Sequence, residues 1–121
     1  MHNLPILSLA FVGDSVFDLW VREKLVMKMR AKVNNLHKGA ISIVNATAQA
    51  KFFAKIKEKL SDEEFAIYNR GKNAKSTPPR NADPKDYAVA TGFEAVLGWL
   101  HLTGQHERVE ELLEHLLENI V

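Results

Sequence analysis

The sequence has no cysteine, which excludes disulfide bonds, thiolate metal sites and cysteine nucleophiles. It also lacks any apolar run of the ~20 residues that a membrane-spanning helix needs, because Asp14, Asp18 and Glu94 interrupt its most hydrophobic stretches. The N-terminal residues carry no basic segment, and their short apolar run is broken by Pro5, unlike a secretory signal peptide. We therefore expect a cytoplasmic protein that does not associate with membranes.

Length and composition indicate one globular domain. The chain has 121 residues, which is long enough for one hydrophobic core and too short for two. Its hydrophobic content of 46% and charged content of 26% are ordinary for a globular protein. We expect a single domain over residues 1–121.

Charge is distributed unevenly along the chain, although the formal net charge is only +1. Residues 1–23 carry a net charge of −2, residues 24–80 carry +9, and residues 81–121 carry −6. Such blocks within one domain predict one basic face and one acidic face. The basic face would suit a polyanion such as a nucleic acid.

The hydrophobic pattern predicts an all-α fold without strands. The first helix, from about Leu7 to Met29, is apolar on nearly every side, which fits a central position in the fold. A second helical region begins at Asn34 or Asn35, either of which can serve as its N-cap, and runs to about Leu60 with one possible break.

The later helices have clearer boundaries. Ser61 and Glu64 form a capping box that opens a helix ending near Gly71. Residues 72–82 form the one long loop, which two adjacent prolines hold in extended geometry. The remaining helices are expected at residues 83–102, with Pro84 in the first helical position, and at residues 106–120, with an apolar stripe on one face.

Two carboxylates, Asp14 and Glu94, lie in apolar helical stretches rich in small residues. Gly13, Gly92 and Gly98 would let the two helices approach closely, so the two acids could meet. A buried carboxylate is costly unless a cation or several donors meet it, and a shared divalent metal is the economical partner. Together with the basic middle of the chain, such a metal would act on the phosphates of a polyanion.

Each acid has a plainer alternative role. Asp14 could be the N-cap of a helix that starts at Gly13, and Glu94 could pair with a lysine or arginine from the basic block. His101 follows Glu94 by about two helical turns and is the histidine worth testing near the acids. Neither alternative is excluded by the local sequence.

The loop region is rich in side chains that can donate hydrogen bonds to phosphate groups, and it contains no acidic residue. It suits the groove of an A-form duplex, because no aromatic residues are interleaved for stacking on single-stranded bases. The four lysines between Lys51 and Lys59 are interpreted as a solvated helix face. The residues predicted to bind RNA are Arg70, Lys72, Asn73, Lys75, Ser76, Thr77 and Arg80.

Three segments resemble the ribonuclease III family. The stretch LAFVGDSVFDLW at residues 9–20 resembles the family's signature helix, and ATGFEAVLGWLHL at residues 90–102 resembles its partner helix. The loop at residues 70–83 resembles that of Mini-ribonuclease III, the short branch with a lone catalytic domain.

The resemblance implies the all-α ribonuclease III catalytic fold and a homodimer. It also implies Mg²⁺-dependent cleavage of double-stranded RNA at the subunit interface, and maturation of the large-subunit (23S) ribosomal RNA precursor. By position, Asp14 and Glu94 match the family's catalytic, metal-binding acids. These properties are expectations from the resemblance.

Two departures from the longer ribonuclease III enzymes stand out. Those enzymes usually carry a further Glu and a further Asp where this chain has Ala10 and Thr91. Two ligands per subunit favour one magnesium completed by water and phosphate. Because the chain ends at Val121, we also expect no appended double-stranded RNA-binding domain, so the catalytic domain would supply all RNA affinity.

The sequence also predicts an interface between two copies of the chain and leaves two alternative functions open. A first helix that is apolar all round should lie partly at a two-fold interface, with Phe11, Val12, Phe17 and Trp20 contributing. The missing acids leave open a catalytically weak or inactive RNA-binding or ribosome-associated scaffold of the same fold. A helical adaptor that docks partners through the last amphipathic helix would explain its leucine stripe, but core packing explains it more simply.

Overall fold

The computed structural model describes residues 4–29 and 32–119, and within them the fold is all-α, as predicted. None of the helices in these residues is long and apolar enough to cross a membrane. The α-helices are α1 (Ile6–Met29), α2 (Val33–Val44), α3 (Ala46–Ile56), α4 (Asp62–Lys72), α5 (Pro84–Leu102) and α6 (His106–Leu113), and the 3-10 helices are η1 (Lys57–Lys59) and η2 (Glu114–Asn119).

The predicted start and stop signals of the later helices are confirmed. Ser61 and Glu64 exchange both capping-box hydrogen bonds at the start of α4, with donor–acceptor distances of 2.8 and 3.1 Å. Asp83 caps α5, and Pro84 occupies its first turn. Gly104 adopts a φ of 75°, a conformation that favours glycine and ends α5.

The second helical region is broken at Asn45, whose side chain accepts a 2.9 Å hydrogen bond from the backbone N–H of Ala48 and caps α3. The prediction that Asn34 or Asn35 caps α2 was wrong. The helix begins at Val33, after Lys32 in extended backbone, so both asparagines already lie within its first turn. The capping asparagine of this region therefore sits at the internal break.

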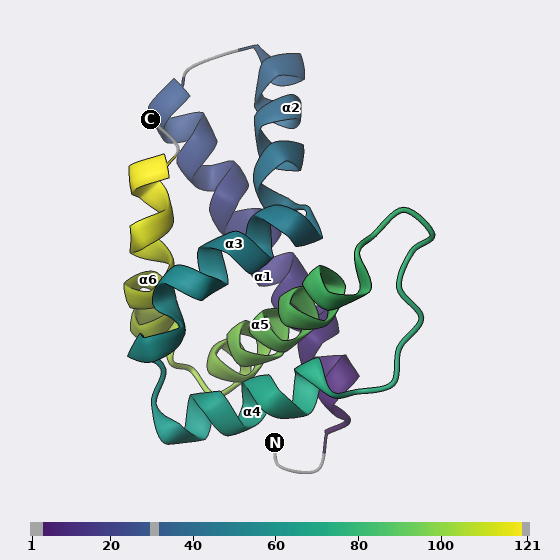
Figure 1. Ribbon diagram of the computed structural model, residues 1–121. Coiled ribbons are helices and arrows are strands. Elements are labelled where there is room, and N and C mark those ends of the chain that lie inside the picture. Colours follow the sequence, from purple (N-terminus) through teal and green to yellow (C-terminus); the bar gives the residue numbers. More distant parts are fainter. Residues whose placement is uncertain (1–3, 30–31, 120–121) are drawn as a thin grey trace.

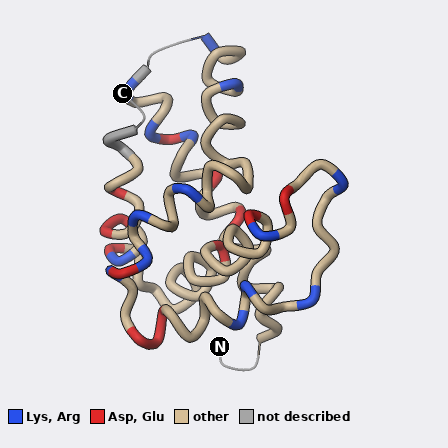
Figure 2. The backbone as a smooth tube through the Cα atoms, in the orientation of Figure 1, with Lys and Arg blue, Asp and Glu red and all other residues tan. Residues whose placement is uncertain are grey.

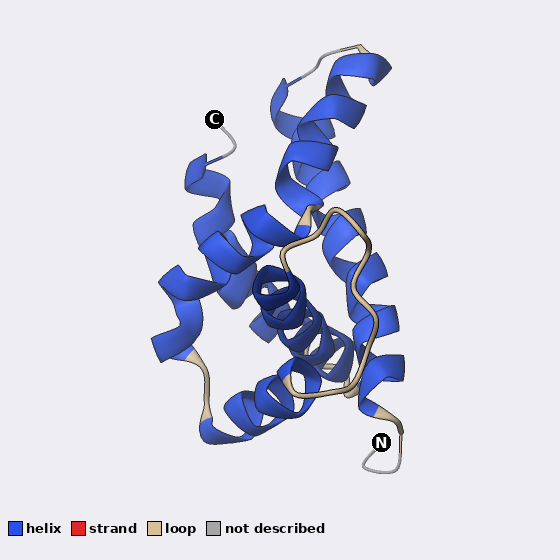
Figure 3. Ribbon diagram, turned by 45° about the vertical axis from the view of Figure 1, so that its right-hand side comes forward, coloured by secondary structure: helices blue, strands red, loops and turns tan. Residues whose placement is uncertain are grey.

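The core is centred on α5, which α1, α3 and α4 surround (Figures 1 and 3). Phe93 on α5 is fully buried and contacts three aromatic rings, those of Phe17, Phe52 and Phe53, at centroid distances of 5.6, 5.9 and 5.7 Å. The prediction that the first helix is central was wrong. One side of α1 packs on α5, while its other side leaves apolar residues such as Phe11 exposed.

The C-terminal region is tied to α4 by Arg108 of α6. Its guanidinium donates to both carboxylate oxygens of Glu64, at 2.8 and 2.9 Å, and to the carbonyl of Lys59 at 2.7 Å. The expected last helix turns into η2 after Leu113, and Ile120 lies outside the described residues. Core packing accounts for the described part of its stripe, because Val109, Leu112, Leu113 and Leu116 are all buried within the chain.

Candidate active site

Helices α1 and α5 cross at a pair of glycines. A Cβ atom on Gly13 would overlap the backbone carbonyl oxygen of Glu94, and one on Gly98 would overlap the carbonyl oxygen of Leu9. The two backbones are therefore in direct contact, which only glycine permits. Asp14 follows Gly13 in the middle of α1, so its alternative role as an N-cap was wrong. The crossing brings Asp14 beside Glu94.

Asp14 and Glu94 line one open cavity of about 520 Å³. Its walls come from α1, from the α2–α3 junction, from the loop that precedes α5 and from α5 itself. The lining residues are Leu7, Ala10, Phe11, Asp14, Val44, Ala46, Gln49, Ser76, Pro79, Ala82, Tyr87, Ala90, Thr91 and Glu94.

The two acids differ in environment. Glu94 is half-buried, whereas Asp14 is exposed in the isolated chain, contrary to the expectation that both are buried. Burial raises the pKa of Glu94 to about 8, and the adjacent Asp14 carboxyl adds to this rise, while a hydrogen bond from Gln49 opposes it. No lysine or arginine of the described residues forms an ion pair with Glu94, so the predicted alternative pairing was wrong.

The donor set around these acids suits a hard divalent cation. It consists of oxygen atoms, and among the described residues no three His, Asp or Glu side chains come together as a metal cluster. Small side chains at Ala10 and Thr91 leave space in the cavity for water, and the Thr91 hydroxyl donates to the Tyr87 carbonyl at 2.9 Å. Two carboxylates with room for water fit one cation that keeps several waters.

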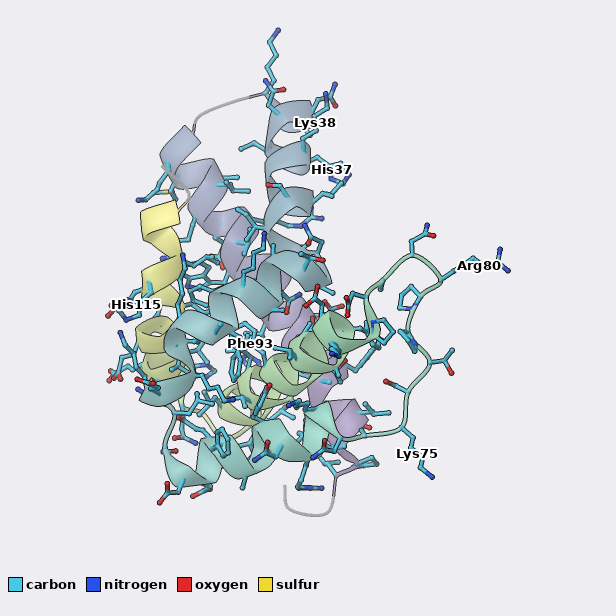
Figure 4. The ribbon with its side chains drawn as sticks, in the orientation of Figure 1. His37, Lys38, Lys75, Arg80, Phe93 and His115 are labelled. Atoms are coloured by element: carbon cyan, nitrogen blue, oxygen red, sulfur yellow. The ribbon has the colours of Figure 1, made fainter. Side chains whose placement is uncertain are left out.

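The loop between α4 and α5 has two distinct sides. Lys75 and Arg80 point away from the helices into solvent (Figure 4), and the loop projects on the side of the molecule opposite the acidic residues of α6 (Figure 2). Its inner side, with Ser76, Pro79 and Ala82, forms a wall of the cavity. All seven residues predicted to bind RNA are exposed, and the structure brings only Ser76 to the cavity.

Comparison with known proteins gives a consistent result. A family model for the ribonuclease III domain matches residues 7–105. The chain belongs to the ribonuclease III family. A Mini-ribonuclease 3 from Symbiobacterium thermophilum is 44% identical over 113 residues, which cover 93% of this chain and 87% of the relative. One from Enterococcus faecalis is 44% identical over 117 residues, which cover 94% and 89% of the two chains.

A solved structure agrees with this assignment. The X-ray crystal structure of a protein from Fusobacterium nucleatum has 28% sequence identity and a TM-score of 0.89, and the match covers 98% of this chain and 96% of that one. The relatives place the chain in the Mini-ribonuclease III branch, as the sequence motifs indicated. It is an endoribonuclease of the ribonuclease III type.

Two side chains, those of His101 and Gln49, have roles that differ from the sequence expectations. His101 does not reach Glu94. Its ring lies 5.0 Å from that of His106, beside a different cavity that includes Trp20. Gln49 was not singled out from the sequence, yet it is buried in the cavity wall and donates to Glu94. The unusual position of a glutamine within the apolar pattern of α3 was the only sequence signal for it.

Proposed function

We propose that this ribonuclease III family member cleaves double-stranded RNA in a magnesium-dependent reaction, with Asp14 and Glu94 holding the cation. The observation that carries the proposal is the crossing at Gly13, which sets the two carboxyls side by side. The raised pKa of Glu94 supports it, because two adjacent carboxylates that form no ion pair with a lysine or arginine of residues 4–29 and 32–119 favour a metal ion.

The chemistry is hydrolysis of a phosphodiester bond. Bound magnesium would neutralise the scissile phosphate and lower the pKa of the attacking water, whose oxygen displaces the 3′ oxygen of the RNA. Asp14 and Glu94 serve as the anionic anchors, and Glu94 must release its proton before it can act as one. The open cavity admits the RNA backbone, and no histidine is needed as a base.

The RNA would lie against the outer side of the loop. Arg70, Lys72, Lys75 and Arg80 are exposed and close in sequence to the cavity wall, and their charges can meet phosphates on either side of the scissile bond. Asn73, Ser76 and Thr77 add neutral donors for phosphates and ribose hydroxyls. The large-subunit (23S) ribosomal RNA precursor is the proposed natural substrate, on the basis of membership in the Mini-ribonuclease III branch.

We also propose a homodimer formed through α1. Phe11 is 79% exposed, and Leu7, Leu19 and Val26 continue an exposed apolar stripe along the same side of the helix. Of the residues predicted for this interface, Phe17 and Trp20 are buried in the chain's own core and were wrongly assigned. Because Phe11 also lines the cavity, a two-fold axis there would place two cavities near each other.

The deciding experiment measures cleavage of long double-stranded RNA in magnesium, with EDTA as the metal-free reference. We expect Asp14→Asn and Glu94→Gln to abolish cleavage while circular dichroism and duplex binding persist. Asp18→Asn is the matched control, because Asp18 also lies on α1 but forms an exposed ion pair with Arg22 at 3.0 Å. Full activity in either site variant would contradict the assignment of the acids.

The natural substrate needs a separate test. Purified protein is incubated with a transcript of the 23S precursor that includes its terminal duplex, and with an unrelated duplex of equal length. We expect preferred cleavage within the precursor duplex. Equal rates at arbitrary positions in both RNAs would refute the substrate proposal and leave the duplex-specific activity intact.

A further inference from the structure

Gln49 on α3 holds a fixed orientation in the cavity wall. Its side chain is buried, at 3% exposure. The Nε2 atom donates to the carbonyl of Val44 at 2.7 Å and to the Oε2 atom of Glu94 at 3.4 Å. The Val44 carbonyl can only accept a hydrogen bond, so the amide nitrogen of Gln49 must face it and the amide oxygen must lie on the other side.

That oxygen has no partner. Among the residues that the structure describes, the Oε1 atom of Gln49 is the one buried side-chain nitrogen or oxygen atom without a hydrogen-bond partner. Buried acceptors without donors are rare in native proteins, and where they occur a bound water or ion commonly supplies the donor. Gln49 lines the same cavity as Asp14 and Glu94, so a ligand of that cavity is the candidate donor.

A purely structural role does not require this arrangement. The junction between α2 and α3 is already held by Asn45, whose side chain caps α3 and donates to two carbonyls of α2 at 3.1 Å each. Filling the space next to Val44 would need only an apolar side chain. A glutamine adds two things, a donor directed at Glu94 and an acceptor that stays unused within the described part of the chain.

We propose that Gln49 is a positioning residue of the cation site: its Nε2 atom orients the Glu94 carboxylate, and its Oε1 atom accepts a hydrogen bond from the water shell of the bound magnesium. This inference rests on the proposed function of Asp14 and Glu94. Magnesium keeps several of its waters in protein sites, and outer-shell partners commonly tune metal affinity. The uncharged amide of Gln49 would thus add a ligand-orienting group to a site that has only two acids among the described residues, because Ala10 and Thr91 stand where the longer ribonuclease III enzymes usually have further acids.

The test measures magnesium binding to the full chain without RNA, by isothermal titration calorimetry at pH 8. We expect Gln49→Met, which keeps the length but removes both polar atoms, to weaken magnesium affinity about 10–100-fold. Gln105→Met is the matched control, because Gln105 is exposed and, within the described residues, its side chain hydrogen-bonds only to the Thr103 hydroxyl. Circular dichroism and thermal unfolding in EDTA establish that each variant is folded.

A second readout separates positioning from folding. Raising the magnesium concentration should restore the cleavage rate of Gln49→Met at saturating RNA, because the variant loses affinity for the ion and keeps both acids. Asp14→Asn should not be rescued. If Gln49→Met does not fold, Gln49→Asn replaces it, since it keeps a polar amide but is too short to reach Glu94, and the same loss of affinity is expected.

The outcomes distinguish the two proposals. If Asp14→Asn loses magnesium binding while folded Gln49 variants bind within about threefold of the unmodified chain, the inference about Gln49 is wrong and the metal site stands. If the unmodified chain does not bind magnesium, or if Asp14→Asn binds it equally well, the proposed function itself fails.

Discussion

Gly13 on α1 lies against the backbone carbonyl of Glu94 on α5, so the spacing between the two candidate acids is set by main-chain contact. A side chain at this position would have to push the helices apart. Asp14 is the next residue in α1. The distance between the two acids therefore depends directly on the close contact between Gly13 and the Glu94 backbone.

Gly13→Ala should lower both stability and cleavage. The added methyl group overlaps the Glu94 carbonyl, and such overpacking typically costs about 1–3 kcal/mol of unfolding free energy. The displaced helix also carries Asp14 away from Glu94, so we expect cleavage to fall by more than about tenfold. Urea unfolding and a duplex cleavage assay measure the two effects. Ser15→Ala, at an exposed neighbouring position, should change neither, and an unaffected Gly13→Ala would refute the role of the crossing.

The stability of the metal-free protein should decrease as pH rises from about 4.5 to about 8. The pKa of Glu94 is raised from 4.5 to about 8 in the fold, first by burial and then by Asp14, so the folded state binds this proton more tightly than the unfolded state. Proton binding by Glu94 thus contributes its full stabilisation to the folded state below pH 4.5. This contribution is lost as the pH rises to about 8. Urea unfolding in EDTA at several pH values measures the trend.

Glu94→Gln is the control for this pH dependence. The variant mimics the protonated acid, so it should unfold at higher urea concentration than the unmodified chain near pH 8 and show a flatter pH profile in this range. In the unmodified protein, magnesium binding at pH 7 should release a proton and become tighter toward pH 8. A metal-free pH profile that is identical in both proteins would refute the raised pKa.

Thr91→Asp should strengthen magnesium binding and weaken the metal-free fold. Thr91 is buried at 7% exposure, lines the cavity and lies one turn before Glu94 on the same helix. A third carboxylate there adds a ligand for the cation, but it repels Glu94 when the cation is removed. Calorimetry with magnesium and urea unfolding in EDTA measure the two effects. Thr91→Asn has a matching shape without the charge, and equal magnesium affinity in both variants would count against a cation at this place.

Replacing Arg70, Lys72, Lys75 and Arg80 with alanine should weaken duplex RNA binding and its salt dependence. Each lost phosphate contact should reduce the log–log salt slope by about 0.9, if the RNA duplex behaves as B-form DNA does. Cleavage at saturating RNA should persist, because these residues do not hold the metal. Fluorescence anisotropy over a salt series measures the slope.

The lysines of α3 supply the control for the loop. Alanine at Lys51 and Lys55, which are exposed on another helix, should leave the slope nearly unchanged. If the loop variant retains full affinity and slope while the α3 variant loses them, RNA binding belongs to α3. The loop would then serve only as the wall of the cavity.

Phe11→Asp should convert a dimer into a monomer. A carboxylate in the exposed apolar stripe of α1 would be buried without a partner at the proposed two-fold interface. Multi-angle light scattering over a range of protein concentrations measures the mass. Phe65→Asp, on the surface of α4, should leave the mass unchanged. A monomer with full activity before any substitution would remove the basis for this interface.

Local signals in the sequence were sufficient for most helix boundaries. The capping box of Ser61 and Glu64, and Asp83 followed by Pro84, act through hydrogen bonds within a few residues, so their outcome depends little on the rest of the fold. Asn34 and Asn35 do not cap α2, because the helix begins at Val33 and both asparagines lie within its first turn, whereas Asn45 caps α3 at the break between the two helices. Short-range chemistry identifies possible caps, and tertiary packing selects among them.

The candidate site was only partly accessible from the sequence. Gly13 and Gly98 indicated a close crossing of α1 and α5, and the structure contains it, whereas the prediction for Gly92 was wrong because that residue lies against Tyr68 of α4. The partial burial of Glu94, the involvement of Gln49 and the position of Ser76 in the cavity wall depend on how α3 and the loop fold back over α5. These contacts join residues far apart in the chain, and no local pattern encodes them.

Helix α5 serves as core and site at once. From Ala90 to Leu100 every residue is buried except Glu94, which is half-buried and faces the cavity. No position in this stretch is spare, because a change in any side chain alters either the hydrophobic centre or the surroundings of the acid. As these enzymes diverge, we expect α5 to change slowly, and new substrate preferences to arise in the loop before it, where side chains can vary without disturbing the interior.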